Sequence, residues 1–186
     1  MKPPPPRVLV RRSLPTEPAI RAAAGLFLAE AALQGVQADR TMLFVGIEPA
    51  SEPIAAGLRV EPGQAVVARR KLLLANGVPV RIASSYLRVD LFGGTRLVEP
   101  EFVQPSLQAA LEDLGHRFGH AEETLIARAA TSFERHTLEL DAEEWVVQVL
   151  RISFSTQDHP IHALETVCAA TRHVFTITQT SGADEF

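Results

Sequence analysis

Three consecutive basic residues lie within a run of aliphatic residues, and they carry the clearest chemical signal in the sequence. Arg69, Arg70 and Lys71 follow residues 66–68, which are apolar, and precede three leucines. Successive side chains of a strand point to opposite faces, so Arg69 and Lys71 share one face with Leu73. Cationic side chains among aliphatic residues either extend to solvent or point toward an anionic partner. Which of these two applies is the main functional question that the sequence raises.

An Asn-Gly pair at positions 76–77 predicts that this strand turns back as an antiparallel hairpin, because both residues tolerate the positive φ angles of a tight turn. A second apolar run at residues 78–86 follows, and Arg81, Ala83 and Ser85 share one of its faces. From these residues alone, a solvent-facing strand face and a ligand-facing one are equally compatible with the pattern.

Catalytic and metal-binding patterns are poorly supported. Ser84 and Ser85 lack the glycines of a nucleophile elbow, and Cys168, the only cysteine, has no basic residue beside it. The closely spaced histidines form two pairs, which glycine or proline interrupts: His116 with His120, and His159 with His162. We therefore expect no catalytic residues, no metal site and no cofactor.

Composition is that of an ordinary globular domain. The 186 residues are 46% hydrophobic and 22% charged, which suits one domain with a substantial core. The net charge of −4 disfavours a broad nucleic-acid surface, because such surfaces carry clustered excess Lys and Arg. The sequence shows neither a signal-peptide pattern nor a membrane-spanning apolar run, so we expect a cytoplasmic location.

The order of the predicted elements indicates an α+β fold, an antiparallel β-sheet flanked by short helices. About seven strands are expected, at residues 41–49, 66–74, 78–86, 122–130, 145–156, 161–170 and 173–179. Short helices are expected at residues 26–34, 51–58, 106–114 and 131–140, and a loop at residues 88–96. The third helix is the clearest, because Ser106 can cap its start and Gly115 can end it.

The sequence divides into three parts. Residues 1–24 are predicted as a proline-rich linker and N-terminal extension, because four consecutive prolines at positions 3–6 favour extended backbone. A frayed terminus and a linker to an upstream domain are both compatible with this composition. Residues 25–180 are predicted to form one domain, and residues 181–186 a C-terminal tail.

A resemblance to a known family covers about residues 26–178. It is carried by residues 70–87, then Ser106-Leu107 with Leu114-Gly115-His116, then 121–123, 150–151 and 159–161, with residues 26–35 similar to a first helix. In this order and spacing they resemble the effector-binding (UTRA) domain of HutC-type GntR transcriptional regulators.

The resemblance implies a chorismate lyase-like fold that binds a small-molecule effector. It further implies a homodimeric repressor in which a winged helix-turn-helix domain, absent from this chain, precedes the effector domain and binds the DNA. The proline-rich start then corresponds to the interdomain linker. The effector changes DNA binding because it binds one arrangement of the two DNA-binding domains more tightly than the other.

Site residues carry over unevenly from sugar-phosphate-binding relatives. Those relatives have basic residues at the places of Lys71 and Leu73, and acids at the places of Ala83 and His162. They also have a serine at Ser106, and an aromatic residue near Cys168. Only Lys71 and Ser106 keep that chemistry.

We therefore expect a larger and more apolar effector with one anionic or acceptor group, which Lys71 and the helix start at Ser106 would contact. His162 would add a polar contact that titrates near neutrality. The full set of candidate ligand-binding residues is Lys71, Leu73, Ala83, Ser106, His162, Cys168, Arg69, Arg81 and Ser85.

Two other functions remain open at this point. A lyase-like enzyme on the same fold could act on a small carboxylate, and a stand-alone dimerisation module could have lost its ligand. An enzyme needs a positioned acid and base, and the matched positions have lost their carboxylates. The sequence therefore favours binding without catalysis.

Overall fold

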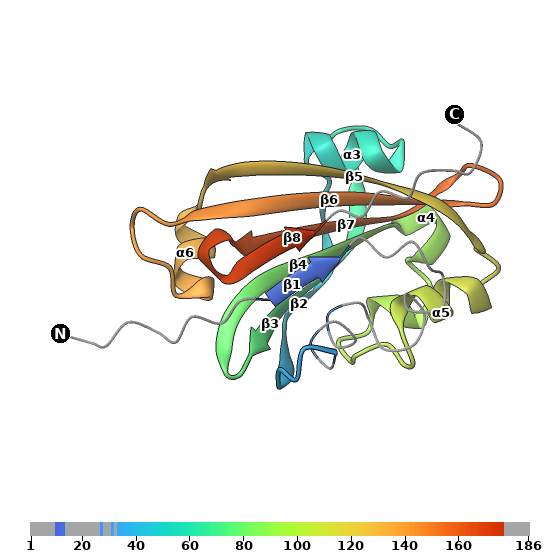
Figure 1. Cartoon of the computed structure of the whole chain (residues 1–186). Coiled ribbons are helices and arrows are strands. Elements are labelled where there is room, and N and C mark those ends of the chain that lie inside the picture. The colour runs from blue at the N-terminus through green and yellow to red at the C-terminus, as the bar shows by residue number, and fades with distance from the viewer. Residues whose placement is uncertain (1–9, 14–26, 28–30, 32, 177–186) are drawn as a thin grey trace, which may run out of the picture.

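The computed structural model describes residues 10–13, 27, 31 and 33–176, and its central feature is a six-stranded antiparallel sheet (Figure 1). The strand order is β2-β3-β4-β7-β6-β5. The strands are β2 (Ala38–Pro49), β3 (Ala65–Ala75), β4 (Val78–Arg88), β5 (Phe118–Ala129), β6 (Trp145–Ser155) and β7 (Pro160–Ala169). The α+β fold with an antiparallel sheet is confirmed.

The β3–β4 hairpin forms around the predicted turn. Asn76 and Gly77 have φ angles of 51° and 77°, so both occupy the left-handed region that a two-residue hairpin turn requires. The strands pair in the register that sets Lys71 opposite Ala83 and Arg69 opposite Ser85. The predicted face of each strand is therefore correct.

Two similar halves build the sheet. Each half has a long strand, a seven-residue helix and a hairpin: β2, α3 (Glu52–Leu58) and β3–β4 in the first, then β5, α6 (Ser132–Leu138) and β6–β7 in the second. The two hairpins adjoin through β4 and β7, so β2 and β5 occupy equivalent positions at the two edges of the sheet.

Helices α3 and α6 cover one face of the sheet, which we call the helix face. Ile54 and Leu58 of α3 pack on Val66 and Tyr86, and Leu138 of α6 packs in a second buried cluster. Each helix thus buries an apolar stripe against alternate residues of the strands.

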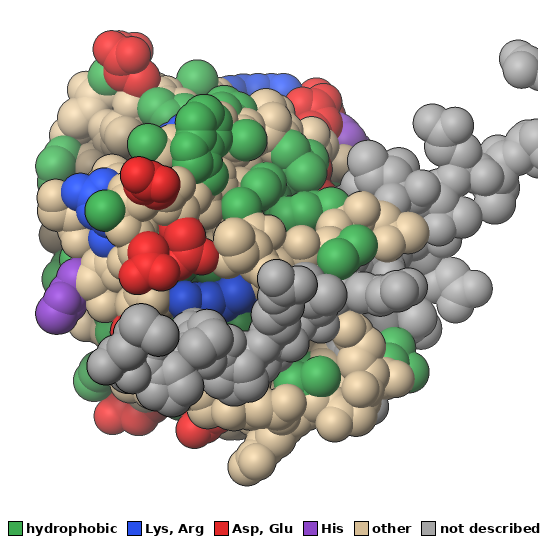
Figure 2. Space-filling view, turned by 60° about the vertical axis from the view of Figure 1, so that its left-hand side comes forward, with side chains coloured by type: hydrophobic (Ala, Val, Ile, Leu, Met, Phe, Trp, Pro, Cys, Tyr) green, Lys and Arg blue, Asp and Glu red, His purple; other side chains and the backbone are tan. Residues whose placement is uncertain are grey.

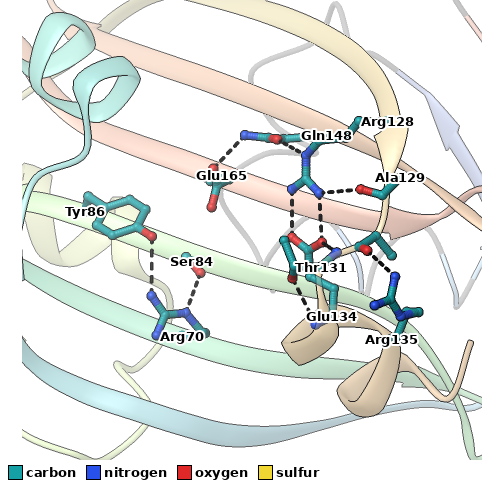
Figure 3. A network of polar contacts seen from close by, with 11 residues as sticks. Arg70, Ser84, Tyr86, Arg128, Ala129, Thr131, Glu134, Arg135, Gln148 and Glu165 are labelled. Carbon is teal, nitrogen blue, oxygen red and sulfur yellow. Dashed lines mark hydrogen bonds and ion pairs between the residues drawn. The ribbon is translucent and has the colours of Figure 1, made fainter.

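A polar network lies on the helix face and fixes the start of α6 (Figure 3). Thr131 and Glu134 form a capping box, and Arg128 donates two hydrogen bonds of 2.7 Å to the Glu134 carboxylate. Gln148 accepts from Arg128 and donates to Glu165, and burial raises the pKa of the Glu165 carboxyl. The network holds Arg128 in one position on β5.

The opposite face, which bears Arg69 and Lys71, is called the cavity face. Two groups of elements cover it, and Figure 1 shows one near the middle of the sheet and one near an end. The first is the parallel pair of β1 (Val10–Ser13) and β8 (His173–Thr176), with the 3-10 helix η2 (Ala170–Arg172) before β8. The second is the connection between the halves, with α4 (Val89–Phe92), η1 (Arg96–Val98) and α5 (Leu107–Asp113).

Several local predictions differ from the structure. Residues 88–96, predicted as a loop, include the short helix α4, whose Phe92 is buried against Val67. Residues 10–13, within the predicted linker, form β1, because pairing with β8 supplies partners for their backbone groups. β5 begins at Phe118, earlier than predicted, because a bulge next to Gly119 lets the strand continue.

The other predictions on the termini fall mostly outside the described residues. In the predicted helix at residues 26–34, Phe27, Ala31 and Leu33 are described and are helical. The remainder of residues 1–24 and the tail at 181–186 lie outside the description. Among the described helices, none combines the length and apolarity needed to cross a bilayer.

Candidate functional site

A cavity of about 200 Å³ lies between the cavity face and the connection that carries α5. Strands β2, β3, β4, β6 and β7 supply its floor, and residues 102–118 supply its wall. The lining residues are Arg40, Met42, Arg69, Lys71, Ser85, Phe102, Val103, Pro105, Ser106, Leu107, Gln108, Leu111, His116, Phe118, Arg151, Ser153, Ile161, His162 and Leu164.

The charge of this lining has one sign. Four of the residues are arginine or lysine, and among the described residues no aspartate or glutamate lines the cavity. Cations gathered in a partly enclosed space raise the local potential and attract anions. The remaining lining is mostly apolar, with aromatic and aliphatic side chains on the α5 side.

Lys71 is the cation that lacks a partner. Its ammonium group makes no hydrogen bond or ion pair within the described ranges, although it is largely enclosed. Burial, together with the nearby positive charges of Arg40 and Arg69, lowers the pKa of Lys71 from 10.5 to about 8. Below pH 8 the cavity therefore holds a charged group with unused donors.

Arg69 has a different role, because its guanidinium already donates to three backbone carbonyls. It donates to the carbonyl oxygens of Leu97 at 2.8 Å, Glu99 at 2.6 Å and Glu101. Burial lowers the pKa of Arg69. Arg69 thus ties the connection between the two halves to the sheet and lines the cavity mainly with its stem.

The other two cations are also engaged. The guanidinium of Arg40 lies over the ring of Phe102, 4.2 Å from its centre, and so joins β2 to the cavity wall. Arg151 lies 3.4 Å from the Glu123 carboxylate and 5.9 Å from the ring centre of Phe118. Both residues orient aromatic side chains that line the cavity.

His162 contributes a neutral polar group to the floor. It pairs across the strands with Ser153, and its Nε2 atom is buried without a hydrogen-bond partner in the described part of the chain. Burial, together with the nearby positive charges of Arg151 and Lys71, lowers the pKa of His162 from 6.5 to about 3. His162 is therefore an uncharged hydrogen-bonding group throughout the neutral range, and the titration near neutrality expected from the sequence is wrong.

The depressed pKa of His162 predicts acid-sensitive stability. Above pH 6.5 the folded and unfolded states both hold the neutral ring, whereas below it only the unfolded state takes up the proton. We expect urea unfolding to show that wild type loses up to about 1.4 kcal/mol more stability per pH unit than His162→Phe, from pH 6.5 toward pH 3. Equal pH slopes would show that His162 titrates normally in the folded protein.

Ser106 lines the cavity, but its hydroxyl has a structural partner. Its Oγ atom accepts a hydrogen bond of 3.1 Å from the backbone N–H of Ala109, which confirms the predicted cap of this helix. The hydroxyl hydrogen remains as a donor. Ser85, which also lines the cavity, faces it from β4.

Four of the predicted site residues lie outside the cavity lining. Leu73 and Ala83 are buried farther along the cavity face, in a cluster with Val10 and Phe27. Arg81 donates to Nε2 of His173 at 3.2 Å, with its guanidinium 4.8 Å from the Phe27 ring centre. Cys168 pairs with Arg81 across the strands and is fully buried. The structure thus brings together Lys71, Ser106, His162, Arg69 and Ser85 and leaves out Leu73, Ala83, Arg81 and Cys168.

Sequence reasoning missed the cavity residues of β2 and β6. Arg40 and Met42 come from the first edge strand, and Arg151 and Ser153 from the fifth strand in sheet order. Alternation identifies Arg151 and Ser153 as neighbours on one face, yet only the register with β7 shows which face this is. His116, on the wall, follows α5 and gave no signal of its own.

The geometry suits binding of a compact anion with an apolar body. A volume of about 200 Å³ lies below the roughly 300–1,000 Å³ that is typical of drug-sized ligands. This differs from the larger effector expected from the sequence, because the cluster around Val10 and Phe27 closes the other half of the cavity face. Within the described ranges, no three His, Cys, Asp or Glu side chains are placed to hold a metal ion.

The chain is an α+β domain whose six-stranded sheet bears a cation-lined cavity on one face, and comparison with known proteins gives its family. Residues 33–174 match the UTRA domain family, so the chain belongs to that family. Over 127 residues it is 30% identical to an uncharacterized HTH-type transcriptional regulator of Streptomyces coelicolor. The match covers 66% of this chain and 47% of that regulator, so the chain spans about half the length of that relative.

Solved structures share the fold, including that of a putative GntR-family transcriptional regulator, which gives a TM-score of 0.78 at 20% identity and covers 94% of this chain and 70% of that chain. PhnF from Mycobacterium smegmatis superimposes with a TM-score of 0.74 at 22% identity, covering 93% of this chain and 72% of the PhnF chain. The C-terminal domain of YurK from Bacillus subtilis gives a TM-score of 0.67 at 25% identity, covering 74% of this chain and 94% of that domain. The chain is thus a UTRA domain of the kind found in GntR-family transcriptional regulators.

Proposed function

We propose that this chain is the effector-sensing and dimerising domain of a HutC-type repressor in the cytoplasm. It binds a small organic anion without converting it. In the intact regulator a winged helix-turn-helix domain binds DNA, and the effector changes the placement of the two DNA-binding domains of a homodimer. The effector shifts this equilibrium by binding the two arrangements with different affinities.

The unpartnered ammonium of Lys71 is the observation that supports this function most strongly. Enclosing a cation beside Arg40 and Arg69 is unfavourable in the empty protein, as its lowered pKa indicates. An anionic ligand would reverse that cost by supplying the missing charge. Groups of this kind are characteristic of functional sites more than of folding cores.

The neighbouring groups define the effector further. His162 offers a neutral nitrogen near Lys71, which suits a hydroxyl or carbonyl close to the anionic group. Phe102, Leu107 and Leu111 suit a short apolar or aromatic body. A small carboxylate or phosphate monoester with ten or so heavy atoms fits this description better than a large amphiphile.

The lining also favours a sensor over a lyase-like enzyme. General acid-base catalysis needs groups that exchange protons near neutral pH. His162 is held neutral, and the described lining includes no carboxylate. Apart from the arginines, Lys71 on the floor and His116 on the wall are the other titratable side chains of the described lining, and neither has a carboxylate beside it there.

The test is a calorimetric titration of the chain with matched pairs of anionic and neutral ligands, such as benzoate with benzamide and aliphatic carboxylates with their amides. We expect at least one carboxylate to bind at pH 7 and its amide to bind far more weakly. Affinity should fall about fivefold between pH 8 and pH 9, since Lys71 loses its proton above about pH 8. Equal binding of the amides, or affinity that is constant up to pH 9.5, would contradict an anion site at Lys71.

A further inference from the structure

The two edges of the sheet differ in how well they could accept another strand. β5 forms one edge, and the structure shows no strand paired with its outer side in the described part of the chain. Its centre is exposed on both faces, with Leu125 at 39% and Ile126 at 54% of full exposure. Figure 2 shows hydrophobic side chains gathered in the upper part of the molecule, where β5 runs in Figure 1.

The equivalent edge strand β2 is interrupted. Its register shifts between Met42 and Phe44, in the middle of the strand, and it ends at Pro49. Bulges and prolines are devices that block pairing at a sheet edge. The single irregularity of β5 lies at its start, between Phe118 and His120, so the strand is regular from there to its end.

We propose that β5 is the surface on which two copies of this chain associate, as antiparallel neighbours that join their sheets into one. The occupant is a second copy because an antiparallel pair of identical strands closes with twofold symmetry and leaves no further free edge there. This inference rests on the homodimer of the proposed function and specifies its interface.

The charges of β5 are self-complementary in this arrangement. Glu122 lies near one end and Arg128 near the other, and both face the helix side of the sheet. When Leu125 lies opposite Leu125 of the second copy, Glu122 lies opposite Arg128 of that copy, and the same contact occurs a second time by symmetry. Arg128 is already oriented by Glu134, whereas Glu122 is exposed and makes no ion pair among the described residues.

The alternative register, centred on Ile126, lacks this match. It sets Glu122 opposite Ala130 and Arg128 opposite Thr124, so the charges lose their partners. Opposite charges across a strand pair stabilise it, and the apolar centre adds burial. We therefore assign the twofold axis to Leu125.

The first experiment measures the mass of the chain by sedimentation velocity over 1–200 µM. We expect wild type to be dimeric, and Leu125→Lys and Leu125→Glu each to weaken the dimer at least 100-fold, because each sets like charges opposite one another at the axis. An equimolar mixture of the two variants should dimerise again. Ile47→Lys is the matched control, since Ile47 is also an exposed aliphatic residue, at 53%, and lies on the other edge strand.

The second experiment tests the register by oxidative cross-linking. Leu125→Cys should form a disulfide-linked dimer, whereas Ile126→Cys should not, because its partner cysteine would lie beyond disulfide reach. The native Cys168 is fully buried, so wild type gives the background level of disulfide cross-linking.

The outcomes separate the proposals. A monomeric wild type at 200 µM overturns both the homodimer and this interface, and leaves anion binding at Lys71 standing. A dimer that resists Leu125→Lys, or that is lost in Ile47→Lys, overturns the β5 interface alone. Cross-linking through Ile126→Cys in place of Leu125→Cys overturns the register.

Discussion

Replacing Lys71 with methionine is expected to weaken binding of an anionic effector by about 10- to 100-fold. A hydrogen bond to a charged group contributes roughly 1.5–3 kcal/mol, and each 1.4 kcal/mol corresponds to a factor of ten in affinity. Lys71 is the cavity cation whose donors have no partner in the described ranges, so its loss is not compensated by Arg69, which is bound to three carbonyls. Titration of the tightest-binding carboxylate at pH 7 measures the change.

The same substitution should stabilise the empty protein. Methionine has nearly the shape of the lysine stem, and it removes a charge that burial, Arg40 and Arg69 all disfavour. Urea unfolding without ligand should therefore show a higher midpoint for Lys71→Met than for wild type. Opposite changes in affinity and stability distinguish a binding residue from a structural one.

Arg70→Met is the matched control for Lys71→Met. Arg70 is the next residue along β3 but faces the helix side, where it donates to Glu48 and Ser84. Its replacement should cost stability and leave affinity for the carboxylate unchanged. If Arg70→Met and Lys71→Met weakened binding equally, the effect would come from the strand as a whole and not from the cavity.

Strand periodicity was sufficient to place Lys71 and Arg69 on one face and Arg70 on the other. It worked because the Asn76–Gly77 turn fixes the β3–β4 register, so that Ser85 and Ala83 follow onto the same face. The same logic correctly predicted five further strands, because their apolar runs are bounded by turns and caps.

Periodicity could not show which part of that face stays open. Leu73 and Ala83 alternate correctly with Lys71, yet Val10 and Phe27 from the N-terminal part of the chain cover them. This packing joins residues more than forty positions apart and leaves no local pattern in the sequence. Only the folded structure distinguishes the covered half of the cavity face from the half that forms the cavity.

Replacing Arg69 with methionine is expected to destabilise the fold by roughly 3 kcal/mol. Three carbonyl groups, those of Leu97, Glu99 and Glu101, would lose a charged donor. Buried acceptors left without donors cost about 1–3 kcal/mol each, partly recovered where water can enter. Urea unfolding measures the loss, and hydrogen exchange should show faster exchange across residues 96–106 than elsewhere in the chain.

Arg88→Met is the control for Arg69→Met, because it removes an arginine from the same end of the sheet. Arg88 pairs only with the neighbouring Asp90, a largely exposed contact that contributes at most about 1 kcal/mol. If both variants lost equal stability, Arg69 would be no more than a surface cation.

Arg69→Met should also change how binding depends on pH. Arg69 is one of the two charges that lower the pKa of Lys71, so its removal raises that pKa above about 8. Lys71 then stays charged to higher pH, and the decline in anion affinity should begin later than in wild type. Weaker binding at pH 7, together with a decline in affinity that begins at higher pH, would show that Arg69 both holds the cavity wall and lowers the pKa of Lys71. A decline at the same pH as in wild type would show that Arg69 holds the wall without affecting the pKa of Lys71.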